Sequence, residues 1–187
     1  MKKTIYLDVS EIKSSVHKII RDLHKDSWHP DYVVGITRGG LVPAVMLSHY
    51  LDVPMHTLHV STRDSNSNES NLWMAEDAYG YVPYEGNEPP YNVTRVTTDP
   101  ARRKNILIVD DINDNGRTLN FIKEDWPSGC IPADPAWNLV WHNNVRFAVL
   151  INNEASDFKD VDYVGTHINK LETPSWIVFS WEDWWER

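Results

Sequence analysis

The chain has 187 residues, of which 41% are hydrophobic and 24% charged, so it can bury the core of one soluble domain. Its formal net charge of -9 argues against a nucleic-acid partner, because phosphate contacts need clustered Lys and Arg side chains. The single cysteine, Cys130, excludes an internal disulfide and favours a reducing compartment. We expect a cytoplasmic protein without a signal peptide or a membrane partner, since no apolar run approaches the length of a membrane span.

The first part of the chain predicts a β–α–β unit. A helix is expected after Ser10, which can cap it, and its apolar positions fall on one stripe: Ile12, Val16, Ile19, Ile20 and Leu23. YVVGI (residues 32–36) is typical of a buried strand, residues 41–51 of a buried helix, and residues 55–60 of the next strand. A strand, a helix and a second strand in this order indicate a parallel sheet.

Residues 61–104 differ in composition from the rest of the chain. STRDSNSNES is polar, and four prolines interrupt the remainder of the segment: Pro83, Pro89, Pro90 and Pro100. We expect a long excursion with an irregular hairpin and a mobile loop, of the kind that often forms a lid. For residues 64–70, plain disorder is an equally strong expectation.

The second part of the chain predicts more strands with helices between them. Strands are expected at residues 106–110, 145–151, 161–165 and 176–181, and helices at about 116–124 and at 134–143. About five buried strands flanked by helices predict an α/β fold with a mainly parallel sheet. No linker or repeat divides the chain, so we expect a single domain over residues 1–187.

The stretch ILIVDDINDNGRT (residues 106–118) places three carboxylates after an apolar strand. Asp110 and Asp111 come at the carboxyl end of that strand, where α/β sheets bind their ligands. Residues 115–118 then open a helix, whose free N–H groups and dipole suit a phosphate. The acids should therefore face sugar hydroxyls, Mg²⁺ or a proton in transit, which predicts a ribose 5-phosphate site. The alternative is that the paired acids start a solvated loop and that Asp114 caps the helix.

This pattern resembles the phosphoribosyl diphosphate (PRPP) signature of the type I phosphoribosyltransferases. Upstream, VVGITRGGLVPAVMLSHYLDVP (residues 33–54) is similar to the pyrophosphate loop of xanthine-guanine and hypoxanthine phosphoribosyltransferases. PSWIVFSWE (residues 174–182) resembles the tail of several purine members. The resemblance implies the type I phosphoribosyltransferase fold, with residues 61–104 as a lid and about 152–187 as a small C-terminal hood and last strand.

The resemblance also implies roles for individual residues. Asp114, near N7 of the base, and Arg38, at the leaving pyrophosphate, would be catalytic, while Asp110 and Asp111 would bind the ribose hydroxyls and Mg²⁺. The further contacts implied are Asp114, Asn115, Gly116, Arg117 and Thr118 for ribose and 5-phosphate, Thr37, Arg38 and Gly39 for pyrophosphate, and Ile112, Asn152, Asn153, Lys170 and Leu171 for the base. The Thr37–Arg38 bond is a candidate for the cis peptide that this loop often has in the family.

The implied activity is transfer of the 5-phosphoribosyl group from PRPP to a purine base (guanine, xanthine or hypoxanthine) in purine salvage, with Mg²⁺ as cofactor. The base-recognition region departs from the family pattern, because Asn152 and Asn153 stand near the position of the usual Lys. Two alternatives stay open: a phosphoribosyltransferase for another base, and a catalytically silent regulator that senses PRPP or a nucleotide. Family members usually form dimers or tetramers, so we expect a homodimer or homotetramer.

Four of the nine tryptophans crowd the end of the sequence: Trp176, Trp181, Trp184 and Trp185. Aromatic side chains at this density could stack on a ligand, and one of them could cover a face of the base. The favoured interpretation is a hydrophobic flap packed on the core or on a second subunit.

Overall fold

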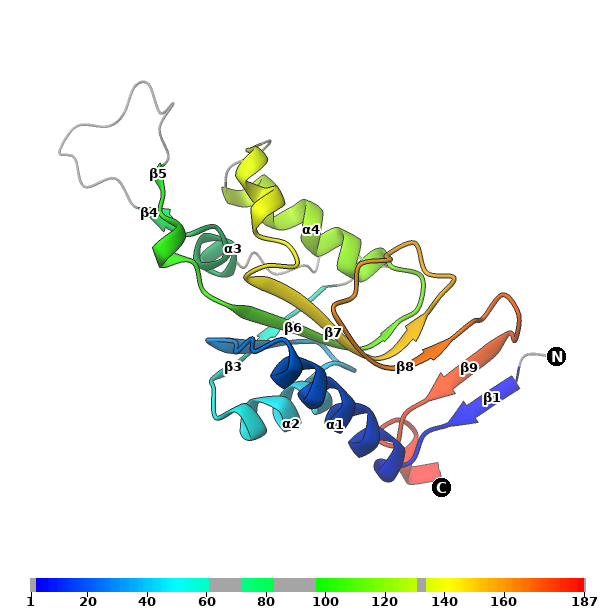
Figure 1. Ribbon diagram of the computed structural model, residues 1–187. Coiled ribbons are helices and arrows are strands. Elements are labelled where there is room, and N and C mark those ends of the chain that lie inside the picture. Colours follow the sequence, from blue (N-terminus) through cyan, green and yellow to red (C-terminus); the bar gives the residue numbers. More distant parts are fainter. Residues whose placement is uncertain (1–2, 61–71, 83–96, 131–133, 187) are drawn as a thin grey trace.

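The computed structural model describes residues 3–60, 72–82, 97–130 and 134–186. Its centre is a five-stranded parallel sheet in the order β3–β2–β6–β7–β8 (Figure 1). The strands are β2 (Tyr32–Ile36), β3 (Met55–Leu58), β6 (Ile106–Asn113), β7 (Val145–Asn153) and β8 (Tyr163–Ile168). The predicted α/β fold with a parallel sheet of about five strands is therefore confirmed.

Helices cover both faces of this sheet (Figure 1). The first two, α1 (Val9–Lys25) and α2 (Leu41–Leu51), lie on one face, and α3 (Leu72–Tyr79) and α4 (Arg117–Cys130) lie on the other. Within the part of the chain described, no helix combines the length and apolarity that a membrane span requires.

Helix α1 buries the five residues of the predicted apolar stripe, but its cap differs from the prediction. Asp8, not Ser10, precedes the first turn: its side chain accepts the N–H of Glu11 at 2.8 Å, and the Glu11 carboxylate accepts the N–H of Asp8 at 2.8 Å. This reciprocal capping box satisfies two backbone donors at once, which a lone serine cannot do.

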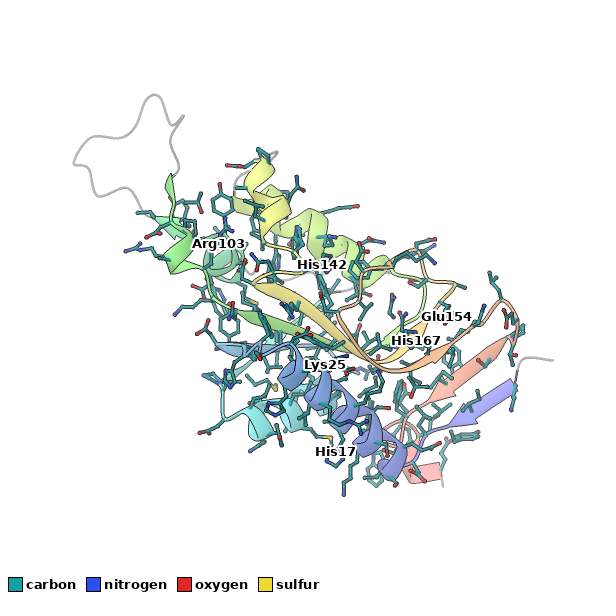
Figure 2. All side chains as sticks on the ribbon, in the orientation of Figure 1. His17, Lys25, Arg103, His142, Glu154 and His167 are labelled. Carbon is teal, nitrogen blue, oxygen red and sulfur yellow. The ribbon has the colours of Figure 1, made fainter. Side chains whose placement is uncertain are left out.

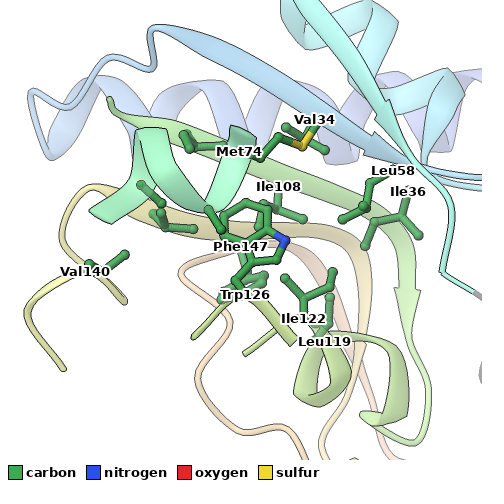
Figure 3. Close-up of a cluster of buried hydrophobic side chains, with 14 of the residues drawn as sticks. Val34, Ile36, Leu58, Met74, Ile108, Leu119, Ile122, Trp126, Val140 and Phe147 are labelled. Carbon is green, nitrogen blue, oxygen red and sulfur yellow. The ribbon is translucent and has the colours of Figure 1, made fainter. Parts of the chain in front are cut away.

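Alternating side chains of the strands fill two hydrophobic layers, one on each face of the sheet. Towards α3 and α4, Ile108 and Phe147 pack with Met74 and Trp126 (Figure 3). The opposite face packs against α1 and α2 and includes Val33, Leu107, Val109, Ala148 and Leu150. Because both faces are covered, strands β2 and β6 are apolar until they reach the carboxyl edge of the sheet.

The excursion over residues 61–104 is only partly the loop that its composition suggests. Residues 72–79 form α3, which buries Met74, Ala75, Ala78 and Tyr79 in the core. The irregular hairpin is confirmed as a short antiparallel pair, β4 (Tyr81–Val82) with β5 (Thr97–Thr98), followed by a 3₁₀ turn at Pro100–Arg102. The expected mobile loop and the candidate disorder of residues 64–70 lie in segments 61–71 and 83–96, outside the described residues.

The last predicted strand is displaced from the central sheet. It is β9 (Ser175–Val178), and it pairs in parallel with β1 (Lys3–Tyr6), a strand that the sequence did not suggest. Figure 1 shows this pair beside the end of β8. A four-residue strand with an exposed face carries too short a pattern to identify without its partner.

Two further elements differ in length from their predictions. Residues 134–143 form no full helix, only the 3₁₀ turn Pro135–Leu139, capped by Asp134, and His142 then takes a positive φ of 62°. Helix α4 instead continues past residue 124 to Cys130, with Pro127 inside it. The longer α4 is a difference at a helix end, where local patterns constrain length weakly.

We predict that Met74→Ala lowers the free energy of unfolding by about 2–4 kcal/mol, because it removes a side chain that is 1% exposed from the layer beneath α3. Leu72→Ala, on the same helix but 41% exposed, should cost less than about 1 kcal/mol. Urea denaturation of both variants measures the difference. Equal, small losses would show that α3 is part of a loosely attached lid.

Candidate active site

Strand β6 carries the predicted acids to the carboxyl edge of the sheet. It lies between β2 and β7, so the loops that follow these strands surround its end. The strand runs through Asp110 and Asp111 to Asn113, three residues further than predicted. Figure 2 shows Glu154 and His167 at this end of the molecule, far from Arg103 at the opposite end of the sheet.

A first cavity of about 450 Å³ opens at this edge. Its walls contain every residue predicted to bind ribose and 5-phosphate, together with three apolar side chains and one buried amide: Val60, Asp110, Asp111, Ile112, Asn113, Asp114, Asn115, Gly116, Arg117, Thr118 and Leu119. Val60, which follows β3, lines the same cavity although it is distant in sequence. The structure therefore gathers the whole 110–118 segment around one space.

The turn at residues 115–118 has the geometry of an anion-binding helix start. Gly116 has a φ of 86°, and a Cβ at this position would lie 2.4 Å from the backbone nitrogen of Phe158, so only glycine fits. Helix α4 begins directly afterwards, at Arg117. The side-chain oxygen of Asn115 accepts the N–H of Arg117 at 3.0 Å, which is the kind of contact that a phosphate oxygen would make at a helix start.

A second cavity, of about 430 Å³, adjoins the first at Asp111. It is lined by Arg38, Gly39, Asp111, Trp181, Glu182, Asp183 and Trp185. The Asp111 carboxylate lies directly on Gly39, where an added Cβ would come 1.8 Å from Oδ2. Two of the three residues predicted to bind pyrophosphate thus share a cavity with a residue predicted to bind metal.

The loop after β2 has the predicted cis peptide bond between Thr37 and Arg38. Thr37 is the one predicted pyrophosphate residue that does not line the second cavity. Its hydroxyl instead bonds Nδ1 of His59 at 2.8 Å, which ties this loop to the segment after β3. No local pattern assigns His59 to the site, because its contact spans 22 positions of the chain.

The two adjacent acids on β6 have unusual proton affinities. Desolvation, followed by the charge of Asp111, raises the pKa of Asp110 well above its usual value. Desolvation also raises the pKa of Asp111 to about 6; the N–H of Ile112 opposes the shift, and the Glu182 carboxylate adds to it. Two carboxylates that resist ionisation in the ligand-free protein are suited to a nearby cation.

The residues predicted to contact the base divide into three groups. Ile112 lines the first cavity, and Lys170 reaches its wall through an ion pair, with Nζ 2.6 Å from Oδ1 of Asp114. Asn152 and Asn153 instead bond within the protein: Asn152 accepts an N–H of Asn113 at 2.7 Å, and Asn153 donates to the carbonyl of Asp114 at 2.7 Å. Leu171 is 82% exposed and lies outside the walls of both cavities.

The C-terminal tail forms a wall of the second cavity that the sequence did not assign there. Trp181 stacks on Phe179, with ring centroids 4.8 Å apart, and lines the cavity together with Glu182, Asp183 and Trp185. Trp181 therefore packs on the core and also faces the site, whereas Trp185 is 65% exposed. Trp176 and Trp184 are 51% and 67% exposed, and a stacking role for any of these rings stays a prediction.

Known proteins resemble this chain in sequence and in fold. A relative from Cereibacter sphaeroides, a xanthine-guanine phosphoribosyltransferase, is 28% identical over 80% of this chain and 68% of its own length. A purine phosphoribosyltransferase from Pyrococcus horikoshii shares the fold, with a TM-score of 0.61 and 24% identity over 98% of this chain and 96% of that one. A xanthine-guanine-hypoxanthine phosphoribosyltransferase from Helicobacter pylori gives a TM-score of 0.62 at 16% identity, covering 97% and 95%.

The family itself is established by the sequence as a whole. The model of the phosphoribosyl transferase domain matches residues 4–182, which span the central sheet, the first cavity and the first part of the tail. The match extends over far more of the chain than the two motifs that first suggested it. The chain therefore belongs to the phosphoribosyl transferase domain family.

Proposed function

We propose that the protein transfers the 5-phosphoribosyl group from PRPP to a purine base (guanine, xanthine or hypoxanthine), giving a nucleoside 5'-monophosphate and pyrophosphate. The observation that supports this most strongly is the pair of adjoining cavities that share Asp111. PRPP carries a phosphate at one end of its ribose and a diphosphate at the other, and the two cavities offer one anion-binding feature each. These are the helix start at residues 115–118 and the guanidinium of Arg38.

In this arrangement the ribose lies over Asp110 and Asp111, at the junction of the cavities. Its 5-phosphate takes the turn of residues 115–118, and Asn115 swings aside as the phosphate accepts the N–H of Arg117. The diphosphate lies in the second cavity beside Arg38 and Gly39. Arg38 then stabilises the charge that develops as the C1–oxygen bond breaks.

The two acids of β6 fit Mg²⁺. Within the described residues no group of three or more His, Cys, Asp or Glu side chains could hold a metal by itself. Mg²⁺ commonly binds through one or two carboxylates plus substrate phosphates, so Asp110 and Asp111 supply what the protein has to provide. When bound, the ion would neutralise the diphosphate leaving group.

At the base end, Asp114 and Lys170 present an acceptor and a donor side by side. A purine of the proposed class carries a ring N–H next to a carbonyl oxygen along one edge, which this pair can match. Ile112 in the cavity wall offers an apolar contact to a face of the ring. The relatives named for xanthine, guanine and hypoxanthine favour the same bases.

The hood and the assembly are part of the same proposal. Residues 1–187 form one domain, in which residues of about 152–187 bring Lys170 and the aromatic tail to the site. Residues 61–104 form the lid region, anchored by α3 and the β4–β5 pair. The protein acts as a homodimer or homotetramer.

A panel of purine and pyrimidine bases, incubated with Mg²⁺ and PRPP and scored for pyrophosphate release, tests the activity. Release with guanine, xanthine or hypoxanthine, abolished by a chelator, is the expected result. Release with another base alone would change the acceptor but keep the enzyme class. Silence across the panel with intact PRPP binding would favour a regulator.

We predict that Asp114→Asn lowers kcat about 100-fold or more, because the amide cannot take up the proton that the base gives off. The fold should be retained, since Asp114 is bonded to Asn153 through its backbone carbonyl. Asp160→Asn is the matched control: its carboxylate is 64% exposed and lies 3.9 Å from Lys123. Steady-state rates decide the point, and equal rates for the two variants would remove Asp114 from the mechanism.

We predict that Asp111→Asn stabilises the ligand-free protein at neutral pH. The folded protein raises the pKa of Asp111 from 3.8 to about 6, so ionisation lowers the stability of the wild type progressively as pH rises through this range. Asparagine does not ionise, so the variant avoids this loss. Its free energy of unfolding should exceed that of the wild type by an amount that grows between about pH 4 and 6 and reaches up to about 3 kcal/mol above pH 6.

Urea denaturation at several pH values, without divalent cations, measures the gain. Parallel stability curves for the wild type and Asp111→Asn would contradict the raised pKa. The same substitution should weaken Mg²⁺-dependent PRPP binding, because it removes a charged metal ligand.

A further inference from the structure

The buried side chain of Asn153 joins the two loops that carry the Asp114–Lys170 pair. Asn153 is 6% exposed and is the last residue of β7. Its amide nitrogen donates to the carbonyl of Asp114 at 2.7 Å, and its amide oxygen accepts the N–H of Lys170 at 3.0 Å and that of Ala155 at 3.2 Å. One amide therefore holds the backbones of both members of the ion pair.

The strand order explains why the side chain at this position contacts two loops. Strand β7 lies between β6 and β8, and Asn153 pairs with Ile168 on β8 while its neighbour Asn152 pairs with Asn113 on β6. Asp114 follows β6 directly, and Lys170 comes two residues after β8. A side chain at the end of the central strand is thus bonded to the loops that follow both neighbouring strands.

We propose that Asn153 is a positioning residue for the base: it sets the separation of Asp114 and Lys170 without touching the substrate. This inference rests on the proposed function, in which that pair contacts the base. Both polar atoms of the amide are bonded within the protein, and the side chain is only 6% exposed. The position needs a donor on one side and an acceptor on the other, which an amide supplies and an apolar side chain does not.

A separate set of bonds holds the phosphate turn, so the effect of Asn153 should be confined to the base. Asn113 donates to Asn152 at 2.7 Å and to the carbonyl of Phe158 at 2.8 Å, and Ser156 donates to Asn113 at 2.7 Å. These bonds fix the segment against which Gly116 packs. None of them involves the side chain of Asn153.

The test compares Asn153→Ala with Asn144→Ala. Asn144 is also 6% exposed and precedes β7 at its other end, where its amide donates to the carbonyls of Ala78 and Lys104, each at 2.9 Å. Both changes remove a buried amide that bonds two segments of backbone, so both should lower the melting temperature. Only Asn153→Ala should lower kcat/KM for the base, by about tenfold or more, with KM for PRPP within about twofold of wild type.

Asn153→Asp provides a second variant if the alanine variant does not fold. It keeps the two acceptor bonds to Lys170 and Ala155 but places an oxygen against the carbonyl of Asp114 in place of a donor. The same selective loss of kcat/KM for the base is expected, because the bond to the carbonyl of Asp114 is lost. Rates for the folded Asn153 variant that match those of Asn144→Ala, or equal losses for base and PRPP, would overturn the inference. If the wild type released no pyrophosphate with any base, the proposed function would instead be refuted.

Discussion

The contact between the Asp111 carboxylate and the backbone of Gly39 holds the two halves of the site together. It is possible only because residue 39 has no side chain, since a Cβ there would overlap the carboxylate. Because β2 pairs with β6, the loop after β2 lies against the end of β6, and the close approach to Gly39 leaves Asp111 as a wall of both cavities. A single residue thus joins the space suited to one end of PRPP to the space suited to the other.

Stability and function oppose each other at the end of β6. The apolar part of the strand, from Ile106 to Val109, is fully buried and anchors it in the core. The two acids that follow are held where their ionisation is unfavourable, as the raised pKa values of Asp110 and Asp111 show. A nearby cation stabilises the ionised form of such acids. The stability that their ionisation costs the ligand-free protein therefore favours binding of a metal with its diphosphate.

The sequence predicted the parts of the molecule whose causes are local. Hydrophobic periodicity predicts the five buried strands and the apolar stripe of α1, and motif spacing predicts the site at residues 110–118. All of these lie where expected. Helix α3 was missed because its four buried residues lie between a polar run and a proline-rich one. Two contacts were missed: the pairing of β1 with β9, and the position of the C-terminal tail beside Arg38 in the second cavity. Both join distant positions of the chain, which hydrophobic periodicity does not encode.

A crystal structure with Mg²⁺ and PRPP bound would show directly whether one substrate molecule occupies both cavities. We predict the 5-phosphate at the turn of residues 115–118, the ribose over Asp110 and Asp111, and the diphosphate beside Arg38 and Gly39. A single PRPP molecule spanning both cavities, with its metal at the Asp111 junction, would support the proposed function. PRPP bound in the reverse orientation, or away from Asp111, would contradict it.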